Sequence, residues 1–226
     1  MDNQKKAFIE FESDNYFSRN QAILTTYNPD NDSVIKILKD YNYQPKSVLE
    51  IGCNAGYRLD GIKKNFPNCE VFGLEPSKEA IRYGSGHYKD ITFIEGTIDD
   101  LSSFENGKFD LVIIGFVFYV VDRSLLFKAV SEIDRVLGNN GVLINIDFFA
   151  TTPHKNAYNH IPGNEAFSYK QNYEEIFLAS ILYQQIDKRS FNHTDKKYDI
   201  TDNFYDKYSI CSLKKNTIHG YSTNRQ

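Results

Sequence analysis

An acid and three turn-forming residues occupy every second position in Glu50-x-Gly52-x-Asn54-x-Gly56, which begins within the mostly apolar run 47–51. Gly52 lets a ligand approach the backbone closely, and Asn54 tolerates a left-handed conformation nearly as well as glycine does. A helix that begins after this loop would favour a negatively charged ligand group at its N-terminus, whereas Glu50 suits a cationic group. The spacing therefore predicts a ligand-binding turn between a strand and a helix.

The same turn differs from the phosphate-binding loop of dinucleotide-binding proteins. In the pattern G-x-G-x-x-G, Asn54 replaces the second glycine and Tyr57 stands where the third belongs. An acid just before the first glycine also suits a cationic group better than a pyrophosphate. A nicotinamide-dependent oxidoreductase is the alternative enzyme class, and it predicts a glycine pattern that this turn lacks.

Two further acids follow later apolar runs. Glu75 follows the run 70–74 and precedes Pro76, and Asp99 follows the run 91–95. Taken alone, Glu75 is an ordinary strand-end acid, and Asp99 is an ordinary loop acid or helix cap. Their order after Glu50, on successive alternating elements, predicts that the three acids bind a cofactor together.

Strands and helices that alternate along the chain must position these residues. Short apolar runs predict buried parallel strands, and a helical spacing of apolar residues predicts the helices between them. Five strands with intervening helices in about 100 residues predict a doubly wound parallel α/β sheet. The expected strands are 47–51, 70–74, 91–95, 109–115 and 142–147; the expected helices are 32–41, 56–65, 77–83 and 124–137, with a turn at 138–141; a helix at 171–180 and strands at 181–189 and 205–213 follow.

With these elements in this order, residues 45–148 resemble the class I S-adenosylmethionine-dependent methyltransferases that act on small molecules. The resemblance rests on the acid-and-glycine turn, on Glu75 and Asp99, on the fourth strand, and on Arg135-Val136-Leu137 before Gly141. It implies a Rossmann-like, mostly parallel seven-stranded sheet with helices on both faces and an antiparallel last strand. It also implies S-adenosylmethionine as the cofactor and S-adenosylhomocysteine as its product.

The resemblance gives roles to residues of this chain. In the family, the acid at the end of the second strand (here Glu75) binds the ribose hydroxyls, and the acid after the third strand (here Asp99) contacts the adenine amino group. Tyr16-x-x-Arg19 resembles a segment by which some relatives close a lid and pair the arginine with the methionine carboxylate; a surface arginine on a short helix is the alternative. The implied cofactor-binding residues are Tyr16, Arg19, Glu50, Gly52, Cys53, Asn54, Gly56, Glu75, Pro76, Thr97, Ile98, Asp99, Gly115 and Phe116.

The cofactor's sulfonium already makes the methyl group electrophilic, so catalysis needs chiefly a nucleophile held in line with water excluded. A base is required only where an acceptor hydroxyl must lose its proton. Histidine suits that task, and we expect His160 first and His154 second, the alternative being solvated loop histidines. Tyr119, after the fourth strand, is expected to line the methyl-transfer channel, or else simply to pack.

The segment after the fourth strand disfavours several acceptors. Gly115-Phe116-Val117-Phe118 stands where amine methyltransferases of nucleic acids carry Asn/Asp-Pro-Pro-aromatic. Gly115 also stands where catechol-type enzymes carry a metal-binding Asp, so we expect no metal. None of the three cysteines follows a proline, which disfavours the cytosine-C5 type.

The expected function is methyl transfer to a small-molecule acceptor, at an oxygen of a sugar or of a glycan-pathway metabolite. Tyr16-x-x-Arg19, the compact core and the acidic pI resemble bacterial enzymes of surface-glycan pathways. Tyr, Asn and His side chains suit a sugar ring and its hydroxyls. Besides the oxidoreductase, a non-catalytic S-adenosylmethionine-binding partner protein stays open, and so does the choice between O- and N-methylation.

Composition bounds the remaining choices. The chain has 226 residues and a formal net charge of −4, which argues against general nucleic-acid binding. No apolar run reaches the roughly 20 residues of a membrane helix, and three cysteines without a C-x-x-C pair favour a reducing cytoplasm.

We expect a cytoplasmic monomer or homodimer with one domain over 1–226. Its expected parts are lid and cover helices at 1–45, the cofactor-binding core at 46–148, an acceptor-binding insertion and the last strands at 149–213, and a flexible tail at 214–226.

Overall fold

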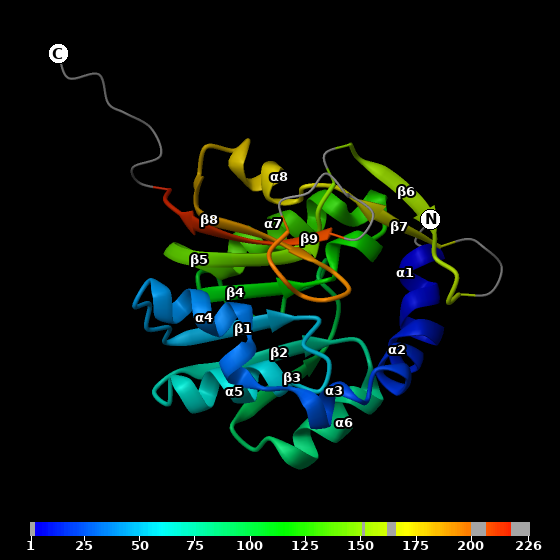
Figure 1. Cartoon of the computed structure of the whole chain (residues 1–226), viewed down its shortest axis with the longest axis horizontal. Helices are drawn as coiled ribbons and strands as arrows, with labels where there is room; N and C mark the ends of the chain where they lie inside the picture. The colour runs from blue at the N-terminus through cyan, green and yellow to red at the C-terminus, as the bar shows by residue number, and fades with distance from the viewer. Residues whose placement is uncertain (1–2, 151, 162–165, 200–206, 218–226) are drawn as a thin grey trace.

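A seven-stranded sheet forms the centre of the computed structural model, which describes residues 3–150, 152–161, 166–199 and 207–217 (Figure 1). Strands β1 to β5 pair in parallel, in the order β3-β2-β1-β4-β5, and β9 pairs antiparallel with both β5 and β8. The predicted fold class, a mostly parallel Rossmann-like sheet with an antiparallel last strand, is confirmed. The strands are β1 (Ser47–Ile51), β2 (Glu70–Glu75), β3 (Ile91–Glu95), β4 (Phe109–Gly115), β5 (Leu137–Phe148), β8 (Tyr183–Asn192) and β9 (Lys207–Lys215).

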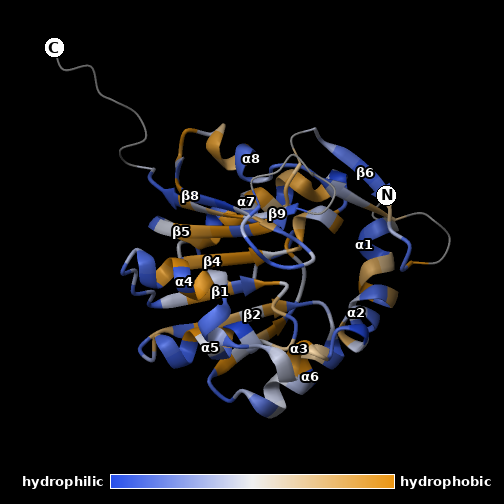
Figure 2. Cartoon of the chain, viewed as in Figure 1, coloured by the Kyte–Doolittle hydropathy of each residue, from blue (hydrophilic) through white to orange (hydrophobic). Residues whose placement is uncertain are grey.

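Helices cover both faces of the sheet because the central strands bury side chains on both sides. Leu49 and Ile51 of β1 pack in one core with residues of α7 and α8, and Val48 packs in a second core with residues of α4 and α5. The central strands are hydrophobic, and hydrophilic residues lie mostly on the outer elements (Figure 2). Among the described residues, no helix has the length and apolar content needed to cross a membrane. The covering helices are α4 (Ser33–Asp40), α5 (Tyr57–Asn65), α6 (Lys78–His87), α7 (Leu126–Val136) and α8 (Glu174–Leu178).

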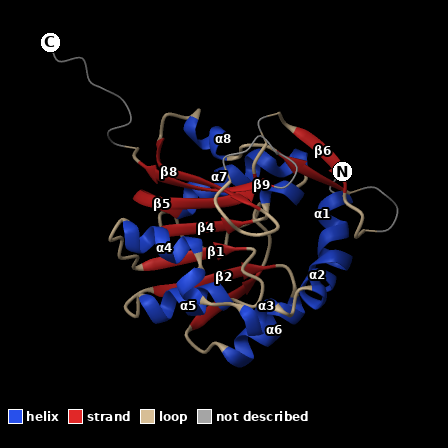
Figure 3. Cartoon of the chain, viewed as in Figure 1, coloured by secondary structure: helices blue, strands red, loops and turns tan. Residues whose placement is uncertain are grey.

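The first described residues form a helical arm, which we call the N-terminal arm: α1 (Asn3–Ala7), a π-helical segment (Phe8–Glu12) and α2 (Ser13–Arg19). It lies beside the carboxyl ends of the central strands (Figures 1 and 3). At one end, Gln4 Nε2 donates to Val120 O and Phe167 O at 2.7 and 2.9 Å. Further along, Asp14 Oδ1 accepts the Ser77 hydroxyl at 2.6 Å. The arm therefore crosses the edge of the sheet at which the predicted site residues stand. Short helical segments at α3 (Ile23–Thr26), Pro29–Asn31, Phe118–Val120 and Arg123–Leu125 complete the chain around this edge.

A separate two-stranded sheet consists of β6 (His154–Ala157) and β7 (Phe167–Lys170). The sequence does not predict these strands, because three of the four β6 residues are exposed and show no apolar alternation. Tyr158, directly after β6, packs against Phe8 of the N-terminal arm with ring centroids 5.0 Å apart. The insertion between β5 and α8 is thereby held against the arm.

Several sequence-based boundaries differ from the structure, and three of the differences lie in the second half of the chain. The expected turn at 138–141 belongs to β5, whose pairing with β4 shifts register between Phe109 and Leu111. The expected helix at 171–180 is confined to α8. Lys214 and Lys215, expected in the tail, end β9, where Lys215 Nζ lies 2.9 Å from Asp134 Oδ1. Residues 218–226 of that tail lie outside the described residues.

Gly84 sets how closely α6 approaches the turn after β1. A Cβ at Gly84 would lie 2.5 Å from Ala55 O and 2.5 Å from Phe93 Cζ. We expect Gly84→Ala to lower the free energy of unfolding by about 1–3 kcal/mol, because the backbone of the turn has no room to give. Urea denaturation measures this change.

Gly86 of the same helix provides the matched control. A Cβ at Gly86 would meet nothing within 4 Å, so Gly86→Ala should raise the free energy of unfolding by up to about 1 kcal/mol through helix propensity. Equal effects of the two substitutions would contradict the close approach of α6 to the turn.

Candidate functional site

The turn after β1 places three left-handed residues in a short span. Gly52, Asn54 and Gly56 have φ values of 72°, 52° and 83°, so Asn54 adopts the conformation expected of it. The Gly52 N–H donates to Leu74 O at 2.8 Å. A Cβ at Gly52 would lie 2.5 Å from Val117 Cγ2, so only glycine fits there. The turn thus stays narrow enough to border a ligand with its backbone.

Glu75 ends β2 and hydrogen-bonds two loops at the carboxyl edge of the sheet, the turn after β1 and the loop after β2. Its Oε2 accepts the Asn54 N–H at 2.8 Å, and its Oε1 accepts the Ser77 N–H at 2.9 Å. Burial raises the pKa of this carboxyl to about 7, although both backbone hydrogen bonds oppose the rise. Each carboxylate oxygen has a further lone pair, so Glu75 can still accept a hydrogen bond from a ligand hydroxyl.

Glu50, the acid before the turn, shares a buried cation with Asp32. Arg58 of α5 hydrogen-bonds Glu50 Oε1 through Nη1 and Asp32 Oδ2 through Nε, the second bond being 2.9 Å long. Glu50 Oε2 is buried and accepts no hydrogen bond from the described residues. Burial raises the pKa of Glu50, and Arg58 opposes the rise. An unpaired buried carboxylate oxygen indicates a ligand with a hydrogen-bond donor.

A first cavity, of about 110 Å³ and here called the apolar cavity, has Asp99 as its polar end. Asp99 Oδ1 accepts the Thr97 hydroxyl at 2.9 Å, and Oδ2 accepts Lys5 Nζ of the N-terminal arm at 2.8 Å. Burial alone would raise the pKa of Asp99, but the bonds from Lys5 and Thr97 outweigh it and hold the pKa below its usual value. Asp99 is therefore an ionised acid that the arm already contacts.

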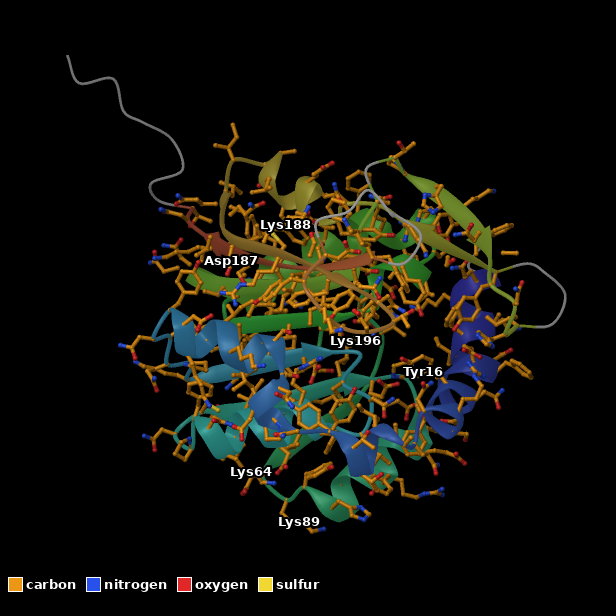
Figure 4. The ribbon with its side chains drawn as sticks, in the orientation of Figure 1. Tyr16, Lys64, Lys89, Asp187, Lys188 and Lys196 are labelled. Atoms are coloured by element: carbon orange, nitrogen blue, oxygen red, sulfur yellow. The ribbon has the colours of Figure 1, made fainter. Side chains whose placement is uncertain are left out.

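A second cavity, of about 190 Å³ and here called the central cavity, adjoins the first. Glu50 and Glu75 line it from the sheet, and Glu12 and Tyr16 line it from the N-terminal arm. Figure 4 shows Tyr16 on the side of α2 that faces the sheet. Arg58 also lines this cavity and pairs with Glu50, so three carboxyl groups face one guanidinium, and the excess of acids favours a ligand that carries positive charge.

Two open clefts meet the central cavity at Tyr16 and Tyr119, which line all three spaces. We call them the outer cleft, of about 780 Å³, and the side cleft, of about 520 Å³. Tyr119, expected to line the methyl-transfer channel, also packs against the hydrophobic cluster that contains Tyr158. Burial raises the pKa of Tyr119 well above its usual value, so this neck between the spaces is uncharged at neutral pH.

Most of the predicted cofactor residues border the apolar or the central cavity. Cys53 and Gly56 border neither cavity. The Cys53 side chain packs on Gly73 of β2, where a Cβ would lie 2.5 Å from Cys53 Sγ, and Gly56 packs on Phe93, whose ring would lie 2.6 Å from a Cβ at Gly56. These two residues shape the turn from its core side. The predicted residues that border a cavity are Tyr16, Glu50, Gly52, Asn54, Glu75, Pro76, Thr97, Ile98, Asp99, Gly115 and Phe116.

Arg19, expected to pair with the methionine carboxylate, borders no part of the apolar or the central cavity. Arg19 forms an ion pair with the buried Glu12, which also accepts the Tyr158 hydroxyl at 2.7 Å. Two helical turns separate Glu12 from Arg19, so both project from the same side of the arm. Arg19 borders the side cleft, whereas Arg58 is the arginine that borders the central cavity.

The two predicted histidines have different surroundings. His160 borders the side cleft together with Tyr119, and its ring centroid lies 5.3 Å from that of Tyr158. His154 stands on β6 with Nδ1 3.0 Å from Thr152 O, and it borders none of the four spaces found among the described residues. The structure therefore keeps His160 near the neck and separates His154 from it.

Sequence reasoning missed several residues that the fold brings to the site, namely Glu12, Asp32, Arg58, Tyr158 and His193. Arg58 carries a usable signal, because it stands in the first turn of the helix that follows the glycine turn. Glu12 and Tyr158 lie 146 residues apart and meet only in the folded chain. No local pattern could have found that pair.

Comparison with known proteins identifies the domain around this edge. Residues 48–141, which include the glycine turn, Glu75 and Asp99, match the family described as a methyltransferase domain. Residues 48–141 form a methyltransferase domain, and the chain has the fold of class I S-adenosylmethionine-dependent methyltransferases. S-adenosylmethionine is the methyl donor of this class.

Solved structures of methyltransferases share the fold of this domain and of most of the chain. The 1,6-didemethyltoxoflavin-N1-methyltransferase of Burkholderia thailandensis, solved with 1,6-didemethyltoxoflavin and S-adenosylhomocysteine, is 11% identical with a TM-score of 0.72, covering 96% of this chain and 91% of that one. The N-methyltransferase NodS of Bradyrhizobium japonicum, solved with S-adenosylhomocysteine, is 15% identical with a TM-score of 0.58, covering 90% and 98%. These likenesses extend the methyltransferase fold to the last strands.

A curated relative is similar over the same region. The ribosomal protein L11 methyltransferase of Fusobacterium nucleatum is 23% identical over 130 residues, which are 55% of this chain and 39% of that protein. The chain spans less than two thirds of the length of each curated relative that we compared. The methyltransferase domain is thus shared with proteins of different size and acceptor.

Glu75 should make binding of S-adenosylhomocysteine dependent on pH. Because its pKa is about 7, this carboxyl is mostly protonated near pH 6 and mostly ionised near pH 8. A hydroxyl donates more strongly to a carboxylate than to a neutral acid, so the affinity should rise about tenfold between these values. Isothermal titration in two buffers of different ionisation enthalpy should show proton release on binding near pH 7. An affinity that is constant or falls over this range would contradict a role for ionised Glu75.

Proposed function

We propose that the chain transfers a methyl group from S-adenosylmethionine to a small molecule held beyond Tyr16 and Tyr119. One observation carries the proposal: the unpaired Glu50 Oε2 and the carboxylate of Glu75 belong to one cavity, which meets two open clefts at a shared neck. Group transfer requires a donor site and an acceptor site that meet in this way, because the reacting atoms must be held close together.

The residues present fit this cofactor group by group. Glu50 Oε2 suits the ammonium of the cofactor, and Glu75 suits the ribose hydroxyls. The apolar cavity suits the adenine ring, whose amino group would share Asp99 with Lys5. Arg58 borders the central cavity and suits the methionine carboxylate, the role that the sequence gives to Arg19.

When bound, the cofactor supplies an electrophilic methyl group, and the chain supplies position and the exclusion of water. The N-terminal arm covers the donor side, since Phe8 borders both the apolar and the central cavity. Tyr16 and Tyr119 border the neck as neutral phenols, because burial raises the pKa of both. They can donate hydrogen bonds to an acceptor oxygen and so orient it toward the methyl group.

We propose an oxygen of a sugar or of a glycan-pathway metabolite as the methyl acceptor. Aromatic side chains in the clefts offer faces for a sugar ring, and Asn20, Asn156 and Asn159 offer amides for its hydroxyls. His160 is the base that we assign, because it borders the side cleft beside Tyr119. The named relatives differ in their acceptors, so the choice is argued from the clefts of this chain.

We also propose a cytoplasmic location. Cys53, Cys69 and Cys211 are buried and form no disulfide among the described residues, which include all three. Unpaired buried thiols suit a reducing compartment.

A calorimetric titration with S-adenosylmethionine, S-adenosylhomocysteine and NAD tests the cofactor. The first two should bind and NAD should not, because Asn54 and Tyr57 interrupt the dinucleotide pattern. Binding of NAD alone would overturn the proposal in favour of an oxidoreductase. Transfer of labelled methyl groups to a small-molecule extract separates an enzyme from a non-catalytic S-adenosylmethionine-binding protein.

Glu75→Gln should weaken S-adenosylhomocysteine binding about tenfold to a hundredfold, because it replaces charge-assisted hydrogen bonds with neutral ones. Glu70→Gln is the matched control at the other end of β2, where Glu70 is exposed and pairs with Lys108 at 3.2 Å. It should leave the affinity unchanged. Unaltered affinity in Glu75→Gln, by the same calorimetry, would remove Glu75 from the ribose site.

His160→Gln should lower turnover on the acceptor found by the labelling screen by about a hundredfold, because general-base catalysis contributes that order of rate. Its S-adenosylhomocysteine affinity should remain that of the wild type. His154→Gln is the control, since His154 borders none of these four spaces. Equal turnover in both variants at neutral pH would exclude His160 as the base.

A further inference from the structure

The N-terminal arm forms one wall of the apolar cavity. Lys5, Phe8 and Ile9 all line this cavity, and they stand three and four positions apart along the arm, so they belong to one face of it. Leu74 of β2 and Ile98 after β3 line the cavity from the sheet. Figure 1 shows the arm beside the carboxyl ends of the strands. A ring bound in this cavity would therefore contact the arm and the sheet edge together.

The position of α1 does not depend on the side chain of Lys5. The buried Gln4 holds α1 in place, because its Oε1 accepts the Phe167 N–H at 3.0 Å and its Nε2 donates to Val120 O and Phe167 O. The segment that follows, Phe8–Glu12, is π-helical, a rare geometry that often occurs at functional sites. These contacts place Lys5 at the cavity whatever its ammonium group binds.

Lys5 carries the one cationic group among the described residues that line the apolar cavity. Its Nζ donates to Asp99 Oδ2 at 2.8 Å. Lys128 Nζ lies 3.7 Å from the same oxygen, but Lys128 does not line the cavity. An ammonium group has three N–H donors, so Lys5 keeps donors for a ligand after its bond to Asp99. The polar end of the cavity thus presents a donor next to an acceptor.

Adenine carries the complementary pair of groups. Its amino group donates, and the ring nitrogens on either side of that group, N1 and N7, accept. Among the lining side chains, Thr97 offers a hydroxyl, but this hydroxyl already donates to Asp99 Oδ1 at 2.9 Å. Lys5 is therefore the side chain that can donate to a ring nitrogen while Asp99 accepts the amino group.

We propose that Lys5 binds the adenine ring of S-adenosylmethionine through one of the ring nitrogens next to the amino group. The inference rests on the proposed function and gives the N-terminal arm a specific part in it. A hydrogen bond from an ammonium group is charge-assisted and stronger than a neutral one. Because Lys5 belongs to the arm, the same bond couples adenine binding to closure of the arm.

Analogues of S-adenosylhomocysteine that lack one ring nitrogen test this contact. Isothermal titration compares S-adenosylhomocysteine with its 1-deaza, 7-deaza and 3-deaza analogues, in each of which a C–H replaces one nitrogen. The 1-deaza or the 7-deaza analogue should bind the wild type about tenfold more weakly, because the ammonium group of Lys5 loses its acceptor. The 3-deaza analogue is the control, since N3 is not next to the amino group.

Lys5→Met removes the ammonium group and keeps the length of the side chain. It should weaken binding of S-adenosylhomocysteine about tenfold and abolish the preference over the 1-deaza or the 7-deaza analogue, and the preference that disappears identifies the nitrogen. Any preference over the 3-deaza analogue should stay as in the wild type. Because each preference is a ratio within one variant, it stays measurable even where the substitution lowers stability.

Lys6→Met is the matched control one position along the same helix. Lys6 is exposed, its Nζ lies 3.8 Å from Glu10 Oε1, and it lines none of the four spaces that the described residues enclose. This variant should keep the wild-type affinity for S-adenosylhomocysteine and the wild-type preferences.

Hydrogen exchange provides a second readout, in the arm itself. Saturating S-adenosylhomocysteine should slow exchange of the backbone amides of residues 3–12 in the wild type and in Lys6→Met, because a ligand that contacts the arm suppresses its opening. The slowing should be smaller in Lys5→Met at saturation. Equal slowing in the two variants would overturn the coupling between adenine and the arm.

The titrations separate failure of this inference from failure of the proposed function. Unchanged affinity for S-adenosylhomocysteine in Lys5→Met would overturn the inference, and so would a rise, which would show that Lys5 only competes with adenine for Asp99. Preferences that survive the substitution would overturn it as well. In each of these cases the wild type still binds S-adenosylhomocysteine and the methyltransferase proposal stands, whereas a wild type that does not bind it loses the proposed function itself.

Discussion

One buried cation organises the donor side: the guanidinium of Arg58 between Glu50 and Asp32. Asp32 is also the N-cap of α4, whose Val34 N–H it accepts at 2.9 Å, so Arg58 links the start of α4 to the end of β1. Two carboxyl groups share one guanidinium in a buried place, and burial raises the pKa of Glu50 to about 7. The second oxygen of Glu50 accepts no hydrogen bond from the described residues. It gives the central cavity its preference for a cationic ligand group.

The N-terminal arm completes the site with polar contacts spread along one helix. Lys5 contacts Asp99, Glu12 accepts the Tyr158 hydroxyl, and Asp14 accepts the Ser77 hydroxyl. Each contact joins the arm to a different part of the chain, so the arm closes over a site that none of these parts encloses alone. A ligand group that donates to Asp99 shares this carboxylate with Lys5. Binding in the apolar cavity and the position of the arm therefore depend on the same acid.

The sequence predicts the donor side better than the acceptor side, for a physical reason. Parallel strands carry their carboxyl ends to one edge, so Glu50 and Glu75 had to meet there once the strands were identified, and Asn54 had to take a left-handed turn. The acceptor side depends on contacts between distant segments, such as Glu12 with Tyr158, which no local periodicity encodes. The pairing of Glu12 with Arg19 was accessible from their spacing on one helix face. The resemblance of Tyr16-x-x-Arg19 to a lid segment of some methyltransferases instead implies that Arg19 pairs with the methionine carboxylate of the cofactor.

The order of the strands also decides which side chains lie next to one another along the edge. Glu50 and Glu75 lie at the carboxyl ends of β1 and β2, whereas Phe116 follows β4 and Phe148 ends β5, next to the buried Asp147. Tyr119 stands between these ends as a neutral phenol, because burial raises its pKa well above the usual value, and its N–H donates to Asp147 Oδ2 at 3.2 Å. Methyl transfer disperses the positive charge of a sulfonium, and a neutral region that excludes water favours that loss of charge. The neutral phenols of Tyr16 and Tyr119, which border the central cavity and both clefts, suit this requirement.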